Sequence, residues 1–309
     1  MPNKSKNQTS PFIGRRGFMT AASLAGAAAL TPPVVAEAAS IAPDLTHQAT
    51  EPAKLVAEAT SSDVELAIRN LVIANRILAH ENVVDAYGHV SMRHPLDPER
   101  YLLARSRSPE QIEIGDIVEY TLDGEPVNDK RPPYLERFIH GSIYAARPDV
   151  HAVVHAHSEE VLPFSIGTAK LRPVIHDGAF IGADVPVWDI ADKFGHDTDL
   201  LVSNMAQGRD LAGRLAGNSM VLMRGHGFAA AAASLYEVVR LAVYAPKNAH
   251  VLQVALLLGG KINPLSKGEI AARVAGPSLK PDTPAAMRAW EYWARRAGVA
   301  DLLPPRLGK

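Results

Sequence analysis

The stretch that decides the fold is His151-Ala152-Val153-Val154-His155-Ala156-His157, an apolar run with two histidines at alternate positions near its end. Such a β-rich run predicts a buried strand. Side chains alternate between the faces of a strand, so His155 and His157 should share a face, with Cα atoms about 6.5 Å apart. Their ring nitrogens can then converge on one cation. His151 shares that face but lies about 13 Å from His155, so it is expected to be a non-ligand.

A third imidazole is available in Met223-Arg224-Gly225-His226-Gly227, which follows a predicted strand over 219–224. The flanking glycines allow a tight, sterically open bend that presents His226 to another element. Three neutral imidazoles leave coordination positions open, as catalytic metal sites do. An isolated H-x-H pair more often represents two satisfied or solvated histidines, so the metal site depends on His226 and on the features that follow.

Glu136 is predicted to lie in a helix that follows Pro132-Pro133 and stops at Pro148. The helical face that it occupies is otherwise largely apolar. A carboxylate on such a face must be paired or bound to metal, because burying it alone is costly. Two interpretations follow: an ion pair with Arg137 or Arg107, or a functional position beside the histidines.

Strands and helices alternate along the remaining chain, which favours a layered α/β domain. Further helices are predicted over 62–80, opened by a Ser62/Glu65 capping box, and from Ser234 to Gly259-Gly260, with a kink at Pro246. Short strands are predicted over 101–104 and 116–120, the second closed by a turn at Asp123-Gly124.

Composition limits the classes of function. With 309 residues and 47% hydrophobic content, the chain can bury a substantial core. The formal net charge is −1, so the electrostatic attraction that drives nucleic-acid binding is missing, and no nucleic-acid partner is expected. There is no cysteine, which excludes disulfides, thiolate nucleophiles and Cys-ligated zinc. Any metal must therefore be held by histidines and carboxylates.

The first residues are interpreted as an export signal. Gly14-Arg15-Arg16-Gly17-Phe18-Met19 precedes a weakly apolar run over 20–30 and an A-x-A-type cleavage site at Ala36-Glu37-Ala38. This order is typical of a twin-arginine signal peptide. The run is far shorter than the roughly 20 apolar residues of a membrane span. The chain is therefore expected to be exported to the periplasm or another extracytoplasmic space, and not to be transmembrane after cleavage.

Four separated motifs resemble, in their order, those of the class II aldolase/adducin family. They are Gly88-His89-Val90-Ser91-Met92-Arg93, Glu136, Arg147-Pro148-Asp149-Val150 running into His155-Ala156-His157, and Arg224-Gly225-His226-Gly227. The resemblance covers roughly residues 62–260. It implies a three-layer α/β/α fold with a central mixed β-sheet flanked by helices. It also implies a homotetramer.

The same resemblance implies that His155, His157 and His226 hold one divalent ion, Zn²⁺ or Mn²⁺, and that Glu136 is the acid/base residue. A divalent ion stabilises the enolate left by C–C cleavage by several kcal/mol, and Glu136 can move the proton that completes the reaction. The expected activity is therefore that of a metal-dependent C–C lyase. Decarboxylation, aldol cleavage and epimerisation all pass through such an intermediate.

The expected domains combine the export signal with this resemblance. They are a signal peptide over 1–38, a linker or arm over 39–61, a class II aldolase-like catalytic domain over 62–275, and a helical tail over 276–309. The tail carries Trp290, Tyr292 and Trp293, which are expected to pack against the body or a neighbouring subunit.

Departures from the family pattern bear on the substrate. Phosphate-binding aldolases carry small hydroxyl residues before the glutamate and an asparagine in the Gly-x-Val-Ser turn, where this chain has Tyr134-Leu135 and His89. Arg105-Ser106-Arg107-Ser108 falls in the segment of the family's second phosphate-contacting loop. An arginine fork suits a planar carboxylate, although a solvated loop is the alternative.

The pattern resembles most closely the family's decarboxylase branch, whose members act on hydroxy-carboxy-muconate semialdehydes or hydroxypyridine dicarboxylates. It includes Tyr134-Leu135-Glu136-Arg137, Leu171-Arg172-Pro173-Val174-Ile175-His176 and Val185-Pro186-Val187. The expected substrate is a small hydroxy-carboxylate from aromatic-compound breakdown. The candidate substrate-binding residues are His89, Ser91, Arg105, Ser106 and His176. The alternatives are an aldolase or epimerase acting on a small hydroxycarbonyl compound or sugar, and a non-catalytic adducin-like module, which the metal histidines disfavour.

Overall fold

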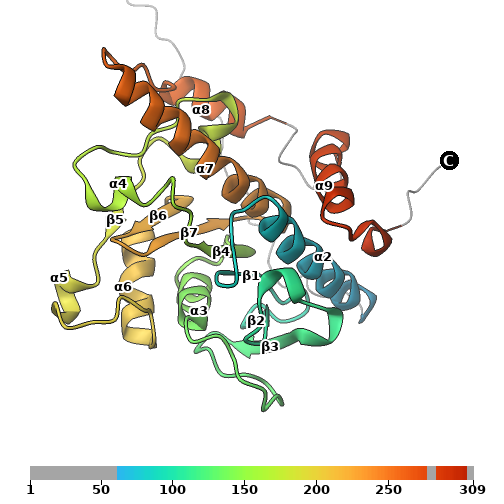
Figure 1. Ribbon diagram of the computed structural model, residues 1–309. Helices are drawn as coiled ribbons and strands as arrows, with labels where there is room; N and C mark the ends of the chain where they lie inside the picture. Colours follow the sequence, from blue (N-terminus) through green and yellow to red (C-terminus); the bar gives the residue numbers. More distant parts are fainter. Residues whose placement is uncertain (1–60, 277–282, 305–309) are drawn as a thin grey trace, which may run out of the picture. The chain divides into compact units, whose positions relative to one another are not determined.

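The computed structural model describes residues 61–276 and 283–304 (Figure 1). A seven-stranded mixed sheet has the order β3-β2-β1-β4-β7-β6-β5. Neighbouring strands are antiparallel except for the parallel pair β5 and β6. The strands are β1 His89–Arg93, β2 Arg100–Ala104, β3 Ile117–Thr121, β4 Ala152–Ala156, β5 Val187–Trp188, β6 Met220–Met223 and β7 Gly227–Ala232.

Helices flank this sheet. They are α2 Ser61–His80, α3 Arg137–Ala146, α4 Pro163–Ile166, α5 Ala191–Phe194, α6 Met205–Leu215, α7 Leu235–Leu258, α8 Lys267–Val274 and α9 Pro284–Arg296. Short 3-10 helices span Pro109–Gln111, Ile114–Asp116, His176–Ile181 and Ala300–Leu302. The predicted α/β fold with a mixed central sheet is therefore confirmed.

Two hydrophobic cores lie on opposite faces of the sheet. One joins the sheet to α2, α7 and α9, and the other joins it to α3 and α6 (Figure 1). The central strand β4 alternates between them: Val154 belongs to the first core and Val153 to the second. All five residues of β4 are buried. A strand covered on both faces needs a continuous apolar run, and 151–157 provides one.

The two long predicted helices are present. α2 ends at His80, as predicted. α7 begins after Ser234, whose hydroxyl accepts the Glu237 backbone N–H at 3.3 Å, and it ends at Gly259, with φ +77°. The helix runs unbroken through Pro246. Among the described residues, α7 alone has the length and apolar composition of a membrane span, but 44% of its most apolar window is buried within the protein.

One strand boundary differs from the prediction. The strand predicted over 116–120 is β3, Ile117–Thr121, and Asp116 ends a 3-10 turn instead. Its buried carboxylate accepts hydrogen bonds from the guanidinium groups of Arg105 at 2.7 Å and Arg107 at 2.5 Å. These charged hydrogen bonds draw Asp116 away from the strand and into the loop that carries both arginines.

The C-terminal helix α9 packs on the body of the same chain. Trp290 and Trp293 are buried, whereas 53% of Tyr292 is exposed. The Trp290 ring lies 4.6 Å from the ring of Tyr236 in α7, centroid to centroid, and α9 also contacts α2. The predicted signal peptide over 1–38, and residues 39–60 of the predicted arm, lie outside the described residues.

Candidate metal centre

The central strand β4 brings two histidines together. His155 lies in β4 and is fully buried, and His157 comes directly after its last residue. Their Nε2 atoms are 2.9 Å apart. The structure therefore places both imidazoles on one face of the sheet, as the period of two predicts.

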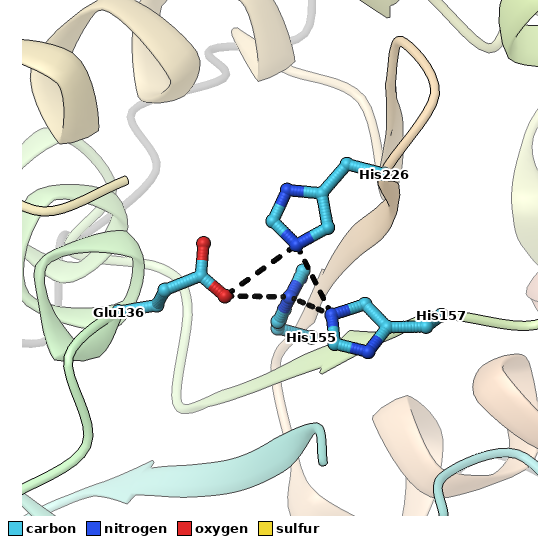
Figure 2. A group of neighbouring side chains, drawn as sticks. All are labelled: Glu136, His155, His157 and His226. Carbon is cyan, nitrogen blue, oxygen red and sulfur yellow. Dashed lines mark hydrogen bonds and ion pairs between the residues drawn. The ribbon is translucent and has the colours of Figure 1, made fainter. Parts of the chain in front are cut away.

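The bend between β6 and β7 supplies the third histidine. Gly225 has φ +66°, a conformation that favours glycine. A Cβ atom on Gly227 would lie 2.2 Å from the carbonyl oxygen of Ala156, so only glycine lets β7 approach β4 this closely. The bend directs His226 toward the pair, with its Nε2 3.1 Å from that of His157 (Figure 2).

Glu136 completes the cluster from α3, but not from inside the helix. It is the N-cap residue, with φ −89° and ψ 19°, so its predicted place within the helix is wrong by one residue. Pro133 forms an isolated β-bridge with Arg105, which keeps the chain extended just before the helix begins. The Glu136 Oε2 atom lies 3.2 Å from His155 Nε2 and 3.5 Å from His226 Nε2 (Figure 2).

The arginines considered as partners of Glu136 are occupied elsewhere. Arg107 pairs with Asp116, and Arg137 donates to the carbonyl oxygen of Gly124 at 2.6 Å. The second oxygen of Glu136, Oε1, accepts the backbone N–H of Val202 at 3.0 Å. Glu136 is therefore held between the histidines and a loop amide.

Backbone carbonyls fix the tautomers of two histidines. Nδ1 of His155 lies 3.0 Å from the carbonyl oxygen of Phe228, and Nδ1 of His226 lies 2.9 Å from that of Leu200. A carbonyl oxygen only accepts, so each Nδ1 carries the hydrogen. With that hydrogen on Nδ1, Nε2 is the nitrogen of each ring that can present a lone pair to a cation at the cluster.

Glu136 is the acidic member of the cluster. Burial alone would raise the pKa of Glu136, but the imidazoles of His155 and His226 outweigh burial and hold that pKa far below its ordinary value. Burial, followed by repulsion from the neighbouring imidazoles, lowers the pKa of His157 to about 4. At neutral pH, His157 is therefore neutral and Glu136 is an anion.

These residues fit a divalent cation. The four ligand atoms all lie within 4.8 Å of one another. A tetrahedral ion with bonds of about 2.0–2.1 Å separates its ligand atoms by roughly 3.4 Å, close to the distances found here. Ring nitrogens and a carboxylate this close together repel one another unless a hydrogen or a cation lies between them, and a divalent cation can bind all four atoms at once. Imidazole and carboxylate ligands suit either zinc or manganese.

A cavity of about 480 Å³ adjoins the cluster, and Glu136 and His157 line it. Its other walls are largely aromatic or apolar and include Tyr87, Tyr134, Leu135 and Leu201. A larger open hollow of about 750 Å³ also reaches His157. The candidate metal centre is therefore accessible to a small molecule.

Two of the five predicted substrate-binding residues, His89 and Ser106, line this cavity, and the other three do not. Ser91 is fully buried behind it. Arg105 is paired with Asp116 at 2.7 Å. The side chain of His176 is 74% exposed and lies beside Asp177. Within this chain, the structure therefore does not bring Ser91, Arg105 or His176 to the cavity.

Sequence reasoning missed several contributors. Leu201 lines the cavity, and the carbonyl of Leu200, a residue with φ +66°, orients His226. His140 hydrogen-bonds to His89. Backbone groups of a loop leave no residue signature, so the role of Leu200 could not be read from the sequence. The position of His140 on the same helical face as Glu136 was visible, but nothing indicated its partner.

Comparison with known proteins identifies relatives. The chain is 35% identical over 260 residues to decarboxylase tropJ from Talaromyces stipitatus. This alignment covers 77% of this chain and 96% of that protein. It is also 29% identical over 216 residues to 3,4-dihydroxyphthalate decarboxylase from Arthrobacter keyseri. That alignment covers 65% of this chain and 83% of the Arthrobacter protein.

The fold also matches a solved structure. L-fuculose 1-phosphate aldolase from Glaciozyma antarctica PI12 superposes with a TM-score of 0.60 at 20% identity, over 79% of this chain and 95% of that chain. The Class II Aldolase and Adducin N-terminal domain matches residues 69–252, which include all four residues of the cluster. The resemblance inferred from the separated motifs is confirmed, and the chain belongs to the class II aldolase/adducin family, as a class II aldolase-like lyase.

Proposed function

We propose that the protein is a metal-dependent carboxy-lyase that removes CO₂ from a small hydroxy-substituted carboxylic acid of aromatic-compound breakdown. The observation that carries the proposal is the convergence of His155, His157, His226 and Glu136 at the wall of a cavity. Relatives named as decarboxylases support CO₂ release over other lyase reactions.

The chain's own residues would divide the work as follows. His155, His157 and His226 would hold a divalent cation, which supplies Lewis-acid polarisation of the substrate oxygens. Glu136 is an anion and can take the proton of a substrate hydroxyl. When the bond to the carboxyl carbon breaks, CO₂ leaves and the electron pair stays on the remaining carbon. Glu136, or a water that it orients, returns the proton to that carbon.

The walls of the cavity favour an aromatic carboxylate over a sugar phosphate. Tyr134 and Leu135 stand where phosphate-binding relatives carry hydroxyls, and Leu201 adds apolar surface. Arg107 also lines the cavity, but its guanidinium is paired with the buried carboxylate of Asp116, which neutralises part of the positive charge that would bind a phosphate dianion. An aldolase or epimerase acting on a small hydroxycarbonyl compound is the second candidate, because the same cluster could serve it.

Metal analysis combined with a product assay tests the proposal. Purified protein is expected to hold about one divalent ion per chain and to release CO₂ from a panel of hydroxy-substituted aromatic carboxylates. Chelation should abolish the release. His226→Ala should lose the ion, whereas His176→Ala, at an exposed position, should keep both ion and activity. Aldehyde release from ketose phosphates without CO₂ release would favour the second candidate.

We also propose export by the twin-arginine route, from Arg15-Arg16 and the run that follows. Replacing both arginines by lysine should retain the protein in the cytoplasm. Equal periplasmic amounts of the two forms would contradict export by this route.

A homotetramer is a further proposal. The C-terminal end of α7 exposes apolar side chains, including Leu257 at 87% and Leu258 at 82%. Such a surface is unusual on a monomer and suits a contact between subunits. Light scattering should give four times the chain mass, and a monomer would contradict this proposal.

A further inference from the structure

Four polar side chains meet between β1 and α3, behind the cavity. His89 and Ser91 are two residues apart in β1 and therefore project from one face of the strand. His140 and Tyr144 are four residues apart in α3 and therefore share one helix face. All four are buried. Buried polar groups require partners, and these four supply them to one another.

The four groups form a continuous hydrogen-bonded chain. The Tyr144 hydroxyl lies 2.8 Å from Ser91 Oγ, which lies 2.6 Å from His140 Nδ1. His140 Nε2 then lies 2.6 Å from His89 Nδ1. Each contact is well within hydrogen-bonding distance. The chain thus runs from a buried phenol to His89, the member that lines the cavity.

The Tyr144 hydroxyl sets the direction of donation along these hydrogen bonds. Burial raises the pKa of Tyr144, so its hydroxyl keeps its hydrogen and needs an acceptor. Among the described residues, that acceptor is Ser91 Oγ. Ser91 must then donate to Nδ1 of His140. The reverse direction would leave a buried phenolic hydrogen unpaired, at a cost of about 1–3 kcal/mol.

The imidazoles of His140 and His89 continue the same direction of donation. An imidazole ring carries a hydrogen on at least one of its two nitrogens, so a ring that accepts at one nitrogen carries its hydrogen on the other. His140 accepts at Nδ1 and therefore carries its hydrogen on Nε2, from which it donates to Nδ1 of His89. His89 then carries its hydrogen on Nε2. Its hydrogen bond to His140 occupies Nδ1, which leaves Nε2–H for the cavity.

We infer that Tyr144, Ser91 and His140 are positioning residues that fix His89 as a neutral Nε2–H donor, and that this donor binds the substrate carboxylate that is lost as CO₂. The role in decarboxylation rests on the proposed function. The tautomer of His89 follows from the hydrogen bonds alone and does not depend on that function.

The position of His89 suits this role. In the register of β1 and β4, His89 lies opposite His155, and the two rings are 5.1 Å apart, centroid to centroid. A carboxylate held by His89 therefore lies beside the cluster but outside it. A cationic partner would stabilise the carboxylate charge in the ground state, and that charge is lost as CO₂ departs. A neutral donor orients the group with less of this unproductive stabilisation.

The tautomer can be measured without any substrate. Protein labelled with ¹⁵N in histidine reports which ring nitrogen carries hydrogen, and a His89→Gln sample assigns the signals of His89. Wild-type His89 should show hydrogen on Nε2 at neutral pH. Ser91→Ala should give mixed tautomers at His140 and His89, and Ser91→Thr, which keeps a hydroxyl, should restore the wild-type pattern. Hydrogen on Nδ1 of wild-type His89, or a charged ring, would overturn the inference.

Binding of two small probes tests the carboxylate role. The probes are 3,4-dihydroxybenzoate and catechol, which differ by one carboxylate, titrated calorimetrically into metal-loaded protein. A glutamine amide nitrogen reaches the place of His Nε2, whereas an asparagine amide nitrogen reaches that of Nδ1. The quantity compared is the ratio of the affinity for 3,4-dihydroxybenzoate to the affinity for catechol. His89→Gln should keep most of this ratio, and in His89→Asn the ratio should fall by at least about tenfold.

The outcomes separate the inference from the proposed function. If His89→Asn keeps the full carboxylate advantage, the donor role is wrong even if the wild type releases CO₂. If the wild type releases no CO₂ but the tautomer and the probe affinities are as expected, the carboxy-lyase proposal fails and the carboxylate-binding donor stands.

Discussion

At the scale of single residues, the candidate centre depends on which nitrogen of each ring carries hydrogen. The carbonyl oxygens of Phe228 and Leu200 bind Nδ1 of His155 and His226, and so direct both lone pairs inward. Glu136 adds the negative charge that a divalent cation would balance. Ligand orientation is therefore set by backbone groups distant in sequence from the histidines.

Replacing Glu136 by glutamine tests its assignment as the acid/base residue. Glutamine keeps the shape and can still accept the Val202 N–H, but it cannot move a proton. CO₂ release should fall by about 10²–10⁴-fold. Metal content, measured on the same samples, separates this loss from loss of the ion. Glu99→Gln, at an exposed position away from the cavity, is the control. Full activity in Glu136→Gln would show that the assigned role is wrong.

At the scale of elements, the start of α3 carries Glu136, and α6 packs against α3. A Cβ atom on Gly208 of α6 would lie 2.4 Å from Ser142 Oγ and 2.5 Å from the carbonyl oxygen of Phe138. Glycine is therefore required for this close helix contact. The same contact helps to hold the helix that presents Glu136 to the histidines.

Two glycines of α6 allow a matched comparison. Gly208→Ala should destabilise the protein by about 1–3 kcal/mol, because the helices must move apart. Gly213→Ala, with no atom within 4 Å of the added methyl, should stabilise it by about 0.4–1 kcal/mol. Urea unfolding measures both free energies. Equal effects would contradict the close contact.

A second contact between elements joins the 3-10 helix His176–Ile181 to α7 and α8. Asp177 Oδ1 lies 2.7 Å from a guanidinium nitrogen of Arg240 and 2.7 Å from one of Arg273. Burial raises the pKa of Asp177, but the two guanidinium groups outweigh burial and lower it overall. The ionised carboxylate therefore stabilises the folded state.

This lowered pKa predicts a pH dependence of stability. A carboxyl group whose pKa is lowered in the folded state contributes its full stabilisation at pH values above its unfolded-state pKa of about 3.9. This stabilisation is lost as the pH falls through the folded-state pKa. Asp177→Asn should destabilise the protein by about 1–3 kcal/mol at pH 7, and the difference from wild type should shrink below about pH 4. Urea unfolding across pH measures this, with the exposed Asp184→Asn as control. A difference independent of pH would contradict the charge argument.

At the scale of the whole molecule, α9 closes the core that α2 and α7 share with the sheet. Trp290 is 2% exposed and packs on Tyr236, whereas Tyr292 on the same helix is 53% exposed. The helix therefore buries one face and leaves the other in solvent.

Substitutions on the two faces of α9 should differ sharply. Trp290→Ala should lower the free energy of unfolding by about 3–5 kcal/mol, because it leaves a cavity in the core. Tyr292→Ala should change it by no more than about 0.5 kcal/mol. Denaturant unfolding of both variants is the measurement. A small effect of Trp290→Ala would mean that α9 does not stabilise the fold.

The sequence by itself determined the features that local pattern encodes. The apolar run over 151–157 predicted β4, and the alternation of His155 and His157 predicted that their rings converge. The cap at Ser234 and the glycines at 259–260 predicted the extent of α7. Strand β7 was missed because Gly227–Ala232 is rich in alanine, which has low β-propensity. It becomes a strand by pairing with β4 and β6.

Only the tertiary structure decided which polar groups reach the site. Arg107 lines the cavity, whereas Arg105 is paired with Asp116, Ser91 lies behind His140, and His176 faces solvent. The physical reason is the distance along the sequence over which each kind of interaction acts. Periodicity and capping act over a few residues, so they can be read along the chain. The partner of a buried charge or imidazole is chosen by the packing of strands and helices distant in sequence, and it is fixed only when those elements meet.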